Sequence, residues 1–134
     1  SRDSSKIQTI YKNLDKRNSI INLKKMKDLS NQARNALLKG DVKTFGDLLN
    51  DSWEIKKSMN HRVSNKKVNK IYDIAKKNGA LGGKLLGAGQ TGYMIIFASP
   101  LYQKKIINLL SKQGAIQEHF SFSEKGLQLW KTQR

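Results

Sequence analysis

Residues 79–97 read Gly79-Ala-Leu-Gly-Gly-Lys-Leu-Leu-Gly-Ala-Gly-Gln-Thr-Gly-Tyr-Met-Ile-Ile-Phe97, and they hold most of the chain's 10 glycines. Glycine adopts positive φ easily and lets the backbone approach another group without a Cβ in the way. The run from Tyr93 to Ala98 is β-branched, aromatic and short, and it stops just before Pro100, so it predicts a strand. We therefore expect a strand, a glycine-rich connection and a second strand. Because Met94–Phe97 shows no polar alternation, this second strand is expected to be central and buried on both faces.

The glycine spacing fits neither of the two common nucleotide-binding motifs. Gly87-x-Gly89-x-x-Gly92 has the spacing of the dinucleotide-binding fingerprint, but that motif must open a helix, and here a strand follows. The segment from Gly79 to Lys84 is one residue too short for a Walker A loop. Leu85 also stands where Ser or Thr would bind Mg²⁺. The sequence thus argues against both classes of nucleotide site.

The composition limits the class of protein. A chain of 134 residues is long enough for one domain with a sizeable core. The absence of cysteine excludes disulfides and thiolate metal sites and fits a reducing compartment, so we expect a cytoplasmic protein. No apolar run approaches the roughly 20 residues of a membrane span. Because the chain begins Ser1-Arg2-Asp3 rather than with Met, we expect it to be a fragment of a longer protein.

The formal net charge of +16 leaves two interpretations open. Basic domains bind nucleic acid through phosphate contacts and counterion release. Here the lysines are dispersed along every predicted helix, and no aromatic residues alternate with them as a base-stacking surface requires. This pattern favours solvated lysines, and it leaves a non-enzymatic basic module that binds nucleic acid or a partner as the alternative.

Helical periodicity and capping residues predict an α+β fold with an antiparallel sheet. Five helices are predicted. The first begins at Ser4, and the second covers about Asn22–Lys39. The remaining three extend from Asp41 to about Met59, from Ser64 or Asn65 to Asn78, and from Pro100 to Gly114. Residues 118–122 and 127–131, around Glu124-Lys125-Gly126, predict a second hairpin. The element order is therefore helices, hairpin, helix and hairpin.

Several segments resemble the C-terminal region of the GHMP sugar and metabolite kinases, and they are most similar to the D-glycero-D-manno-heptose 7-phosphate kinase branch. The main resemblance is Gly79-Ala-Leu-Gly-Gly-Lys-Leu-Leu-Gly-Ala-Gly89 followed by Gly92 and an apolar strand. The other segments that agree are Arg2-x-Ser4-x-x-Ile7, Met26-Lys27-x-Leu29, Gly40-Asp41-x-x-x-Phe45-Gly46-x-Leu48-Leu49, Trp53-x-x-Lys56-Lys57, and Val63-Ser64-Asn65 before Ile71-Tyr72.

The resemblance implies a ferredoxin-like C-terminal domain over residues 1–134, in which helices pack on one face of a roughly four-stranded antiparallel sheet. It also implies an ATP-dependent kinase of a heptose phosphate or a related sugar. The partner is then an N-terminal kinase domain, which carries the phosphate-binding loop, the Mg²⁺ ligands and the catalytic acidic residues. ATP and Mg²⁺ would be held by the complete enzyme and not by this chain alone, which we expect to be inactive in isolation. Membrane and nucleic-acid partners are not expected.

The resemblance places the glycine-rich connection beside the phosphates, at one wall of the cleft between substrate and ATP. The loop residues are Gly87, Ala88, Gly89, Gln90, Thr91 and Gly92. Relatives usually carry glycine at the positions of Gln90 and Thr91. The alternative interpretation of this loop is a tight hairpin that serves packing alone.

Further substrate-side candidates are Lys84, Lys56, Lys57 and Trp53, with solvated lysines and a core tryptophan as the alternatives. His61 and His119 show no metal-ligand spacing, and we find no catalytic or metal-binding set in the chain.

Overall fold

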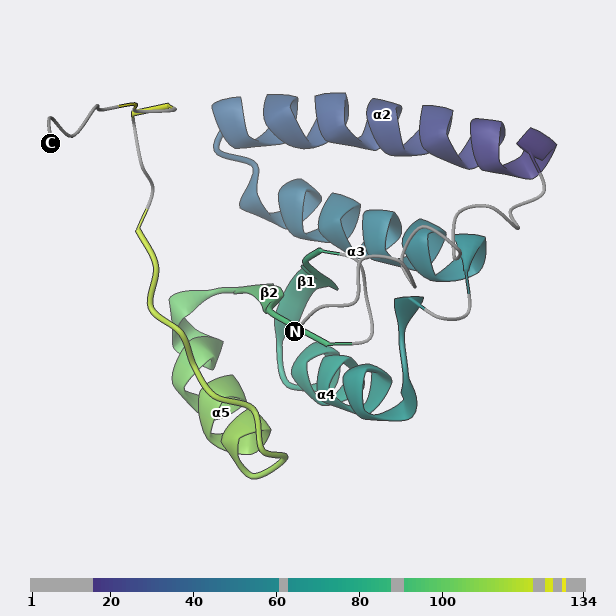
Figure 1. Cartoon of the computed structure of the whole chain (residues 1–134). Helices are drawn as coiled ribbons and strands as arrows, with labels where there is room; N and C mark the ends of the chain where they lie inside the picture. Colours follow the sequence, from purple (N-terminus) through teal and green to yellow (C-terminus); the bar gives the residue numbers. More distant parts are fainter. Residues whose placement is uncertain (1–15, 61–62, 88–90, 122–124, 127–128, 130–134) are drawn as a thin grey trace, which may run out of the picture.

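The structure is a computed structural model that describes residues 16–60, 63–87, 91–121, 125–126 and 129. Four helices and two strands occupy these residues, shown in Figure 1. In chain order they are α2 (Lys16–Leu38), α3 (Val42–Met59), α4 (Lys66–Lys77), β1 (Ala80–Leu85), β2 (Met94–Ala98) and α5 (Pro100–Ser111). The α+β class is confirmed. The helix predicted to begin at Ser4 lies outside the described residues, and α2 begins earlier than the predicted Asn22.

Side-chain caps set the beginnings of two helices where the sequence predicted them. The Asp41 carboxylate accepts a hydrogen bond from the Thr44 N–H at 3.0 Å, and this bond lowers the pKa of Asp41. The Asn65 side chain accepts from the Val68 N–H at 2.9 Å. α5 begins with Pro100, whose fixed φ suits the first turn of a helix. These starts need only local contacts, which explains why the sequence predicts them.

β1 and β2 form a two-stranded antiparallel hairpin, with Lys84 opposite Ile95 and Leu85 opposite Met94. The prediction of a central strand buried on both faces is wrong for the described structure, because β2 is half-buried along its whole length. β1 is the only strand that pairs with β2 among the residues described, and no described strand lies along the other edge of β2.

The expected second hairpin and a four-stranded sheet are not found in the described part of the chain. Residues 118–121 form no strand there. Residues 122–124, 127–128 and 130–131, which belong to the same prediction, lie outside the described residues.

Helices cover both faces of the hairpin, which corrects the expectation that they pack on one face. Figure 1 shows the hairpin between α3 on one side and α4 and α5 on the other, with α2 lying along α3. On the α3 side, the Phe97 ring meets the Phe45 ring edge-on, with ring centroids 5.1 Å apart. The neighbouring Ile96 packs instead against the cluster of α4 and α5 residues that contains Ala75 and Ile106. Successive strand residues point to opposite faces, so one short strand contacts both helical layers.

Two glycines allow α3 to approach β1 at backbone distance. A Cβ on Gly82 would collide with the carbonyl oxygen of Gly46 in α3. A Cβ on Gly46 would in turn collide with the side chain of Leu81. Both collisions involve atoms held close to the backbone, so neither could be relieved by turning a flexible side chain. The Gly46–Gly82 contact therefore fixes how closely the helix and the strand pack.

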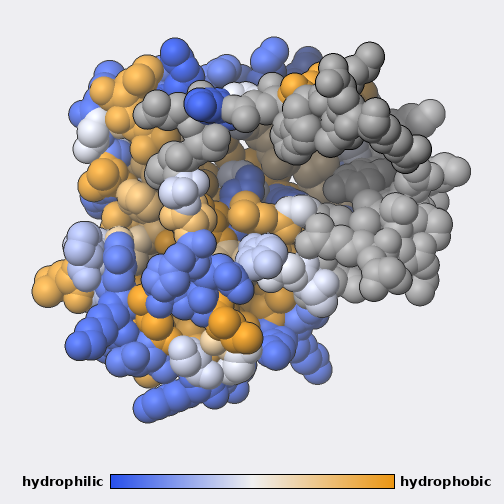
Figure 2. Space-filling view, turned by 60° about the vertical axis from the view of Figure 1, so that its left-hand side comes forward, coloured by the Kyte–Doolittle hydropathy of each residue, from blue (hydrophilic) through white to orange (hydrophobic). Residues whose placement is uncertain are grey.

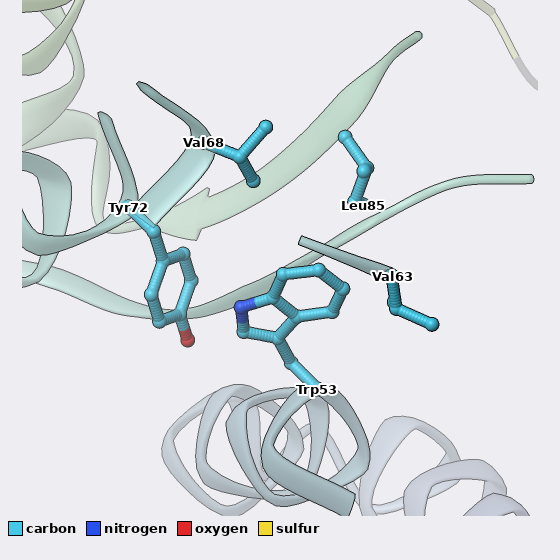
Figure 3. Close-up of a cluster of buried hydrophobic side chains, with 5 residues drawn as sticks. All are labelled: Trp53, Val63, Val68, Tyr72 and Leu85. Carbon is cyan, nitrogen blue, oxygen red and sulfur yellow. The ribbon is translucent and has the colours of Figure 1, made fainter. Parts of the chain in front are cut away.

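The core between α3, α4 and β1 centres on Trp53, which has no exposed surface. Figure 3 shows its indole surrounded by Val63, Val68, Tyr72 and Leu85. The Trp53 and Tyr72 rings meet at 63° with centroids 6.4 Å apart, a favourable edge-to-face arrangement. The Tyr72 hydroxyl donates to the Asn50 side chain at 2.7 Å, and burial raises the pKa of Tyr72 to about 12. No helix in the described residues is long and apolar enough to cross a membrane.

We predict that Gly82→Ala lowers the free energy of unfolding by about 1–3 kcal/mol, because the added methyl group pushes β1 away from the backbone of α3. Gly126→Ala is the control, since nothing lies within 4 Å of the Cβ it would gain. Urea unfolding of the chain, followed by the fluorescence of its tryptophans, measures both. Equal stability of the two variants would contradict the close approach of α3 and β1.

Candidate functional site

The glycine-rich connection joins the two strands at one end of the hairpin. Its first and last residues, Gly87 and Gly92, have φ values of 77° and 124°, a region that residues other than glycine rarely adopt. The Leu86 N–H donates to the Tyr93 carbonyl at 2.8 Å, so the pairing of the strands continues up to the connection. Ala88, Gly89 and Gln90 lie outside the described residues, and Thr91 is exposed. The described flanks thus form a sharply turned backbone at the surface.

Lys56 of α3 holds the first residue of this connection. Its Nζ donates to the Gly87 carbonyl at 2.6 Å and makes a longer contact of 3.5 Å with the Leu85 carbonyl. The side chain is half-buried, and burial lowers the pKa of Lys56, with a further lowering from the charge of Lys84. Lys56 is therefore a structural link between α3 and the loop as well as a partly desolvated cation.

Lys84 of β1 projects toward the same part of α3. Its Nζ donates to the Ser52 hydroxyl at 3.2 Å, and the residue is half-buried. Ser52 and Lys56 are four residues apart on α3 and so lie on one helical face. The structure thus brings together two predicted candidates, Lys56 and Lys84, where β1 ends and the glycine-rich connection begins. We call this place the foot of the loop.

The two other candidates do not join this group. The Lys57 Nζ forms an ion pair with Glu54 at 2.8 Å and lies 5.8 Å from the centroid of the Trp53 ring. Trp53 points into the core (Figure 3). Both side chains are thus engaged within the domain, one on the surface of α3 and one beneath it.

Sequence reasoning missed Ser52 and the backbone carbonyls of Leu85 and Gly87. The four-residue spacing of Ser52 and Lys56 is visible in the sequence, but it acquires meaning only when Lys84 is placed against that face of α3. The carbonyl contacts likewise depend on how α3 lies on β1. These groups can therefore be identified only from the tertiary structure.

The described residues contain no group of three His, Cys, Asp or Glu side chains placed to hold a metal ion. His119 is exposed, and His61 lies outside the described residues. Two open hollows lie between α2 and α3, with volumes of about 530 and 450 Å³. Their linings include Phe45 and Leu37 in the first and Asp51 and Glu54 in the second, and neither is lined by Lys56 or Lys84.

Comparison with known sequences assigns most of the described domain to one family. The family model described as "GHMP kinases C terminal" matches residues 33–116. The D-glycero-alpha-D-manno-heptose 7-phosphate kinase of Campylobacter jejuni is 36% identical over 98 residues, which cover 73% of this chain and 29% of that protein. The bifunctional fucokinase/GDP-fucose pyrophosphorylase of Arabidopsis thaliana is 27% identical over 106 residues, which cover 79% of this chain and 10% of that protein. The chain thus spans less than a third of each of these relatives.

Solved structures agree with this assignment. The mevalonate kinase of methicillin-resistant Staphylococcus aureus superposes with a TM-score of 0.62 at 29% identity, covering 72% of this chain and 32% of that one. The L. major mevalonate kinase, solved in complex with R-mevalonate, gives a TM-score of 0.66 at 27% identity, covering 84% of this chain and 35% of that one. From the family match and the shared fold together, we conclude that this chain belongs to the GHMP kinases and comprises their C-terminal domain.

Proposed function

We propose that this chain forms one wall of the cleft between substrate and ATP in an ATP-dependent sugar kinase, and that the sugar is a heptose phosphate. The substrate proposal is supported by the 36% identity to a protein named as a heptose 7-phosphate kinase. The rest of the kinase is an N-terminal domain, and the complete enzyme acts in the cytoplasm.

The main observation in support of this function is the glycine-rich connection together with Lys56, which binds its first residue. Gly87 and Gly92 give the connection a backbone without side chains at its two flanks, and Lys56 fixes the Gly87 carbonyl at 2.6 Å. A backbone turn of this kind can bring N–H groups close to a phosphate. Catalysis of phosphoryl transfer depends chiefly on positioning and on stabilising charge, and a fixed backbone turn with exposed N–H groups can contribute to both.

The described residues of this chain suit the phosphates of ATP better than they suit Mg²⁺. The lysines and the glycine-rich connection suit the oxygens of a phosphate group. The described residues offer no cluster of carboxylates for Mg²⁺, which prefers oxygen ligands. We therefore assign the Mg²⁺ ligands to the N-terminal domain. When bound, the Mg²⁺–ATP complex supplies the phosphoryl group, and the glycine-rich connection of this chain lies beside its phosphates.

The alternative of a non-enzymatic basic module has no specific observation in its favour. Figure 2 shows hydrophilic and hydrophobic residues interspersed over the visible face, rather than one continuous hydrophilic stripe. Two of the lysines of α3, Lys43 and Lys57, are paired with acidic neighbours on the same helix. Such a mosaic fits solvated lysines better than a phosphate-backbone track.

In the complete kinase, we predict that Gly87→Ala lowers kcat/KM at least about tenfold per folded molecule, which corresponds to about 1.4 kcal/mol of transition-state stabilisation. The reason is that a Cβ changes the backbone turn that faces the phosphates. The matched control is Gly40→Ala in the turn between α2 and α3. Its φ of 70° is close to the 77° of Gly87, and nothing lies within 4 Å of its added Cβ.

Both variants carry a similar backbone strain, of about 1–2 kcal/mol. Unfolding curves should therefore show similar losses of stability, whereas steady-state kinetics should separate the two. If Gly87→Ala retains wild-type kcat/KM per folded molecule, the connection is a structural hairpin and the proposal for the loop is wrong.

We further predict that the 134-residue chain alone phosphorylates no sugar. Its described residues hold no group of three metal-ligating side chains, and in the proposed function the N-terminal domain supplies the Mg²⁺ ligands that position the nucleotide for transfer. The measurement is ADP release from ATP in the presence of heptose 7-phosphate, compared with the complete protein at equal concentration. Steady turnover by the chain, purified to exclude host kinases, would contradict the proposed division of the active site.

A further inference from the structure

Lys56 and Lys84 come from different elements and meet at the foot of the glycine-rich connection. Lys56 lies in the last turns of α3 and reaches the Gly87 carbonyl, while Lys84 lies in β1 and reaches Ser52 of α3. Their charges are close enough that Lys84 lowers the pKa of Lys56. The fold thus holds two cations side by side against their mutual repulsion.

Only some of the hydrogen-bond donors of these two ammonium groups have acceptors among the described residues. An ammonium group has three donors. In the described structure Lys56 directs its donors to two carbonyls, at 2.6 and 3.5 Å, and Lys84 directs one to the Ser52 hydroxyl. Among the described residues, at least one N–H of Lys56 and two of Lys84 have no acceptor and can bind a further one.

No acidic residue in the described part of the chain pairs with either amine. The ion pairs found there join Lys43 to Asp47 and Lys57 to Glu54, both within α3. Two half-buried cations without an anion carry a desolvation cost and a repulsion, and a bound dianion would relieve both. Lys43 and Lys57 of α3 each have an acidic partner on the same helix, whereas Lys56 and Lys84 have no acidic partner among the described residues.

We propose that Lys56 and Lys84 form a phosphate-binding subsite, and that it takes the phosphate group which the sugar substrate already carries. This inference rests on the proposed function. A phosphate dianion matches two ammonium groups in charge, and its several oxygens can accept all of the remaining N–H groups. The subsite would select phosphorylated over unphosphorylated sugars.

The position of the subsite favours the sugar's own phosphate over those of ATP. In the proposed function, the glycine-rich connection faces the group being transferred. Lys84 is in β1, before the connection begins, and Lys56 reaches only its first residue, Gly87. A phosphate at the foot of the loop is thus displaced from the reacting atoms, as a phosphate that does not react must be.

Lys56 also couples the subsite to the loop. Because its ammonium group holds the Gly87 carbonyl, an anion bound to the same amine fixes the start of the connection. Binding energy from a non-reacting part of a substrate can in this way support catalysis. Loss of Lys84 should therefore weaken substrate binding, and loss of Lys56 should weaken binding and also lower kcat. Lys56 is a positioning residue in this respect.

The test uses the complete kinase with Lys84→Gln and Lys56→Gln, which remove one charge each and keep a polar side chain. The control is Lys43→Gln, which removes the same charge from the same helix about 20 Å away along its axis. We expect the KM for the sugar phosphate to rise at least tenfold in both variants and to stay unchanged in the control. The KM for ATP should stay within about twofold, and Lys84→Arg, which keeps the charge and can bind phosphate, should retain most of the affinity. Only Lys56→Gln should also lower kcat.

A second measurement does not depend on kinase activity. Inorganic phosphate, titrated at constant ionic strength into the 134-residue chain, should shift the NMR signals of the Gly87 and Lys84 amides in wild type and not in the double variant Lys56→Gln/Lys84→Gln. An unchanged spectrum in wild type overturns the subsite. A rise in the KM for ATP alone overturns its assignment to the sugar. If the complete protein phosphorylates no sugar, the proposed function fails, while the titration still decides whether the lysines bind phosphate.

Discussion

The close contact between α3 and β1 governs how the other elements are placed. Gly46 and Gly82 meet with backbone against backbone, and a methyl group on either would force the two elements apart. Helices in proteins ordinarily pack at a distance set by their side chains. Here the missing side chains remove that spacing, so the positions of α3 residues relative to β1 are set more tightly than apolar packing alone would set them.

This contact determines where the lysines lie. Ser52 and Lys56 can meet Lys84 and the Gly87 carbonyl only because α3 runs close to β1. The glycines of residues 79–97 therefore have two different roles. Gly82 removes bulk beneath a helix, whereas Gly87 supplies a positive φ at the start of the connection. A dense run of glycines in the sequence does not reveal this division, because it depends on which neighbour each glycine faces.

Features with local causes could be predicted, and features with tertiary causes could not. Asp41 and Asn65 cap helices through bonds to residues three positions ahead, so the sequence contains both partners. The hairpin from Ala80 to Ala98 was also predicted, since it joins adjacent segments. The burial of β2 was overestimated because an apolar run does not show whether another strand covers its edge. Likewise, Lys56 and Lys57 look equivalent in sequence, yet one reaches the loop and the other pairs with Glu54.

Trp53 connects the core to the lysine pair without belonging to it. Its fully buried indole is enclosed by α4 and the end of β1, and it fixes the rotation of α3 about its own axis (Figure 3). Successive residues of a helix point about 100° apart, so anchoring Trp53 also sets the directions of Ser52 before it and Lys56 one turn later. A tryptophan beside lysines suggests a ligand contact when read along the chain. In the folded domain its effect on the site is indirect: the core holds α3 in the one rotation that brings Lys56 to the Gly87 carbonyl.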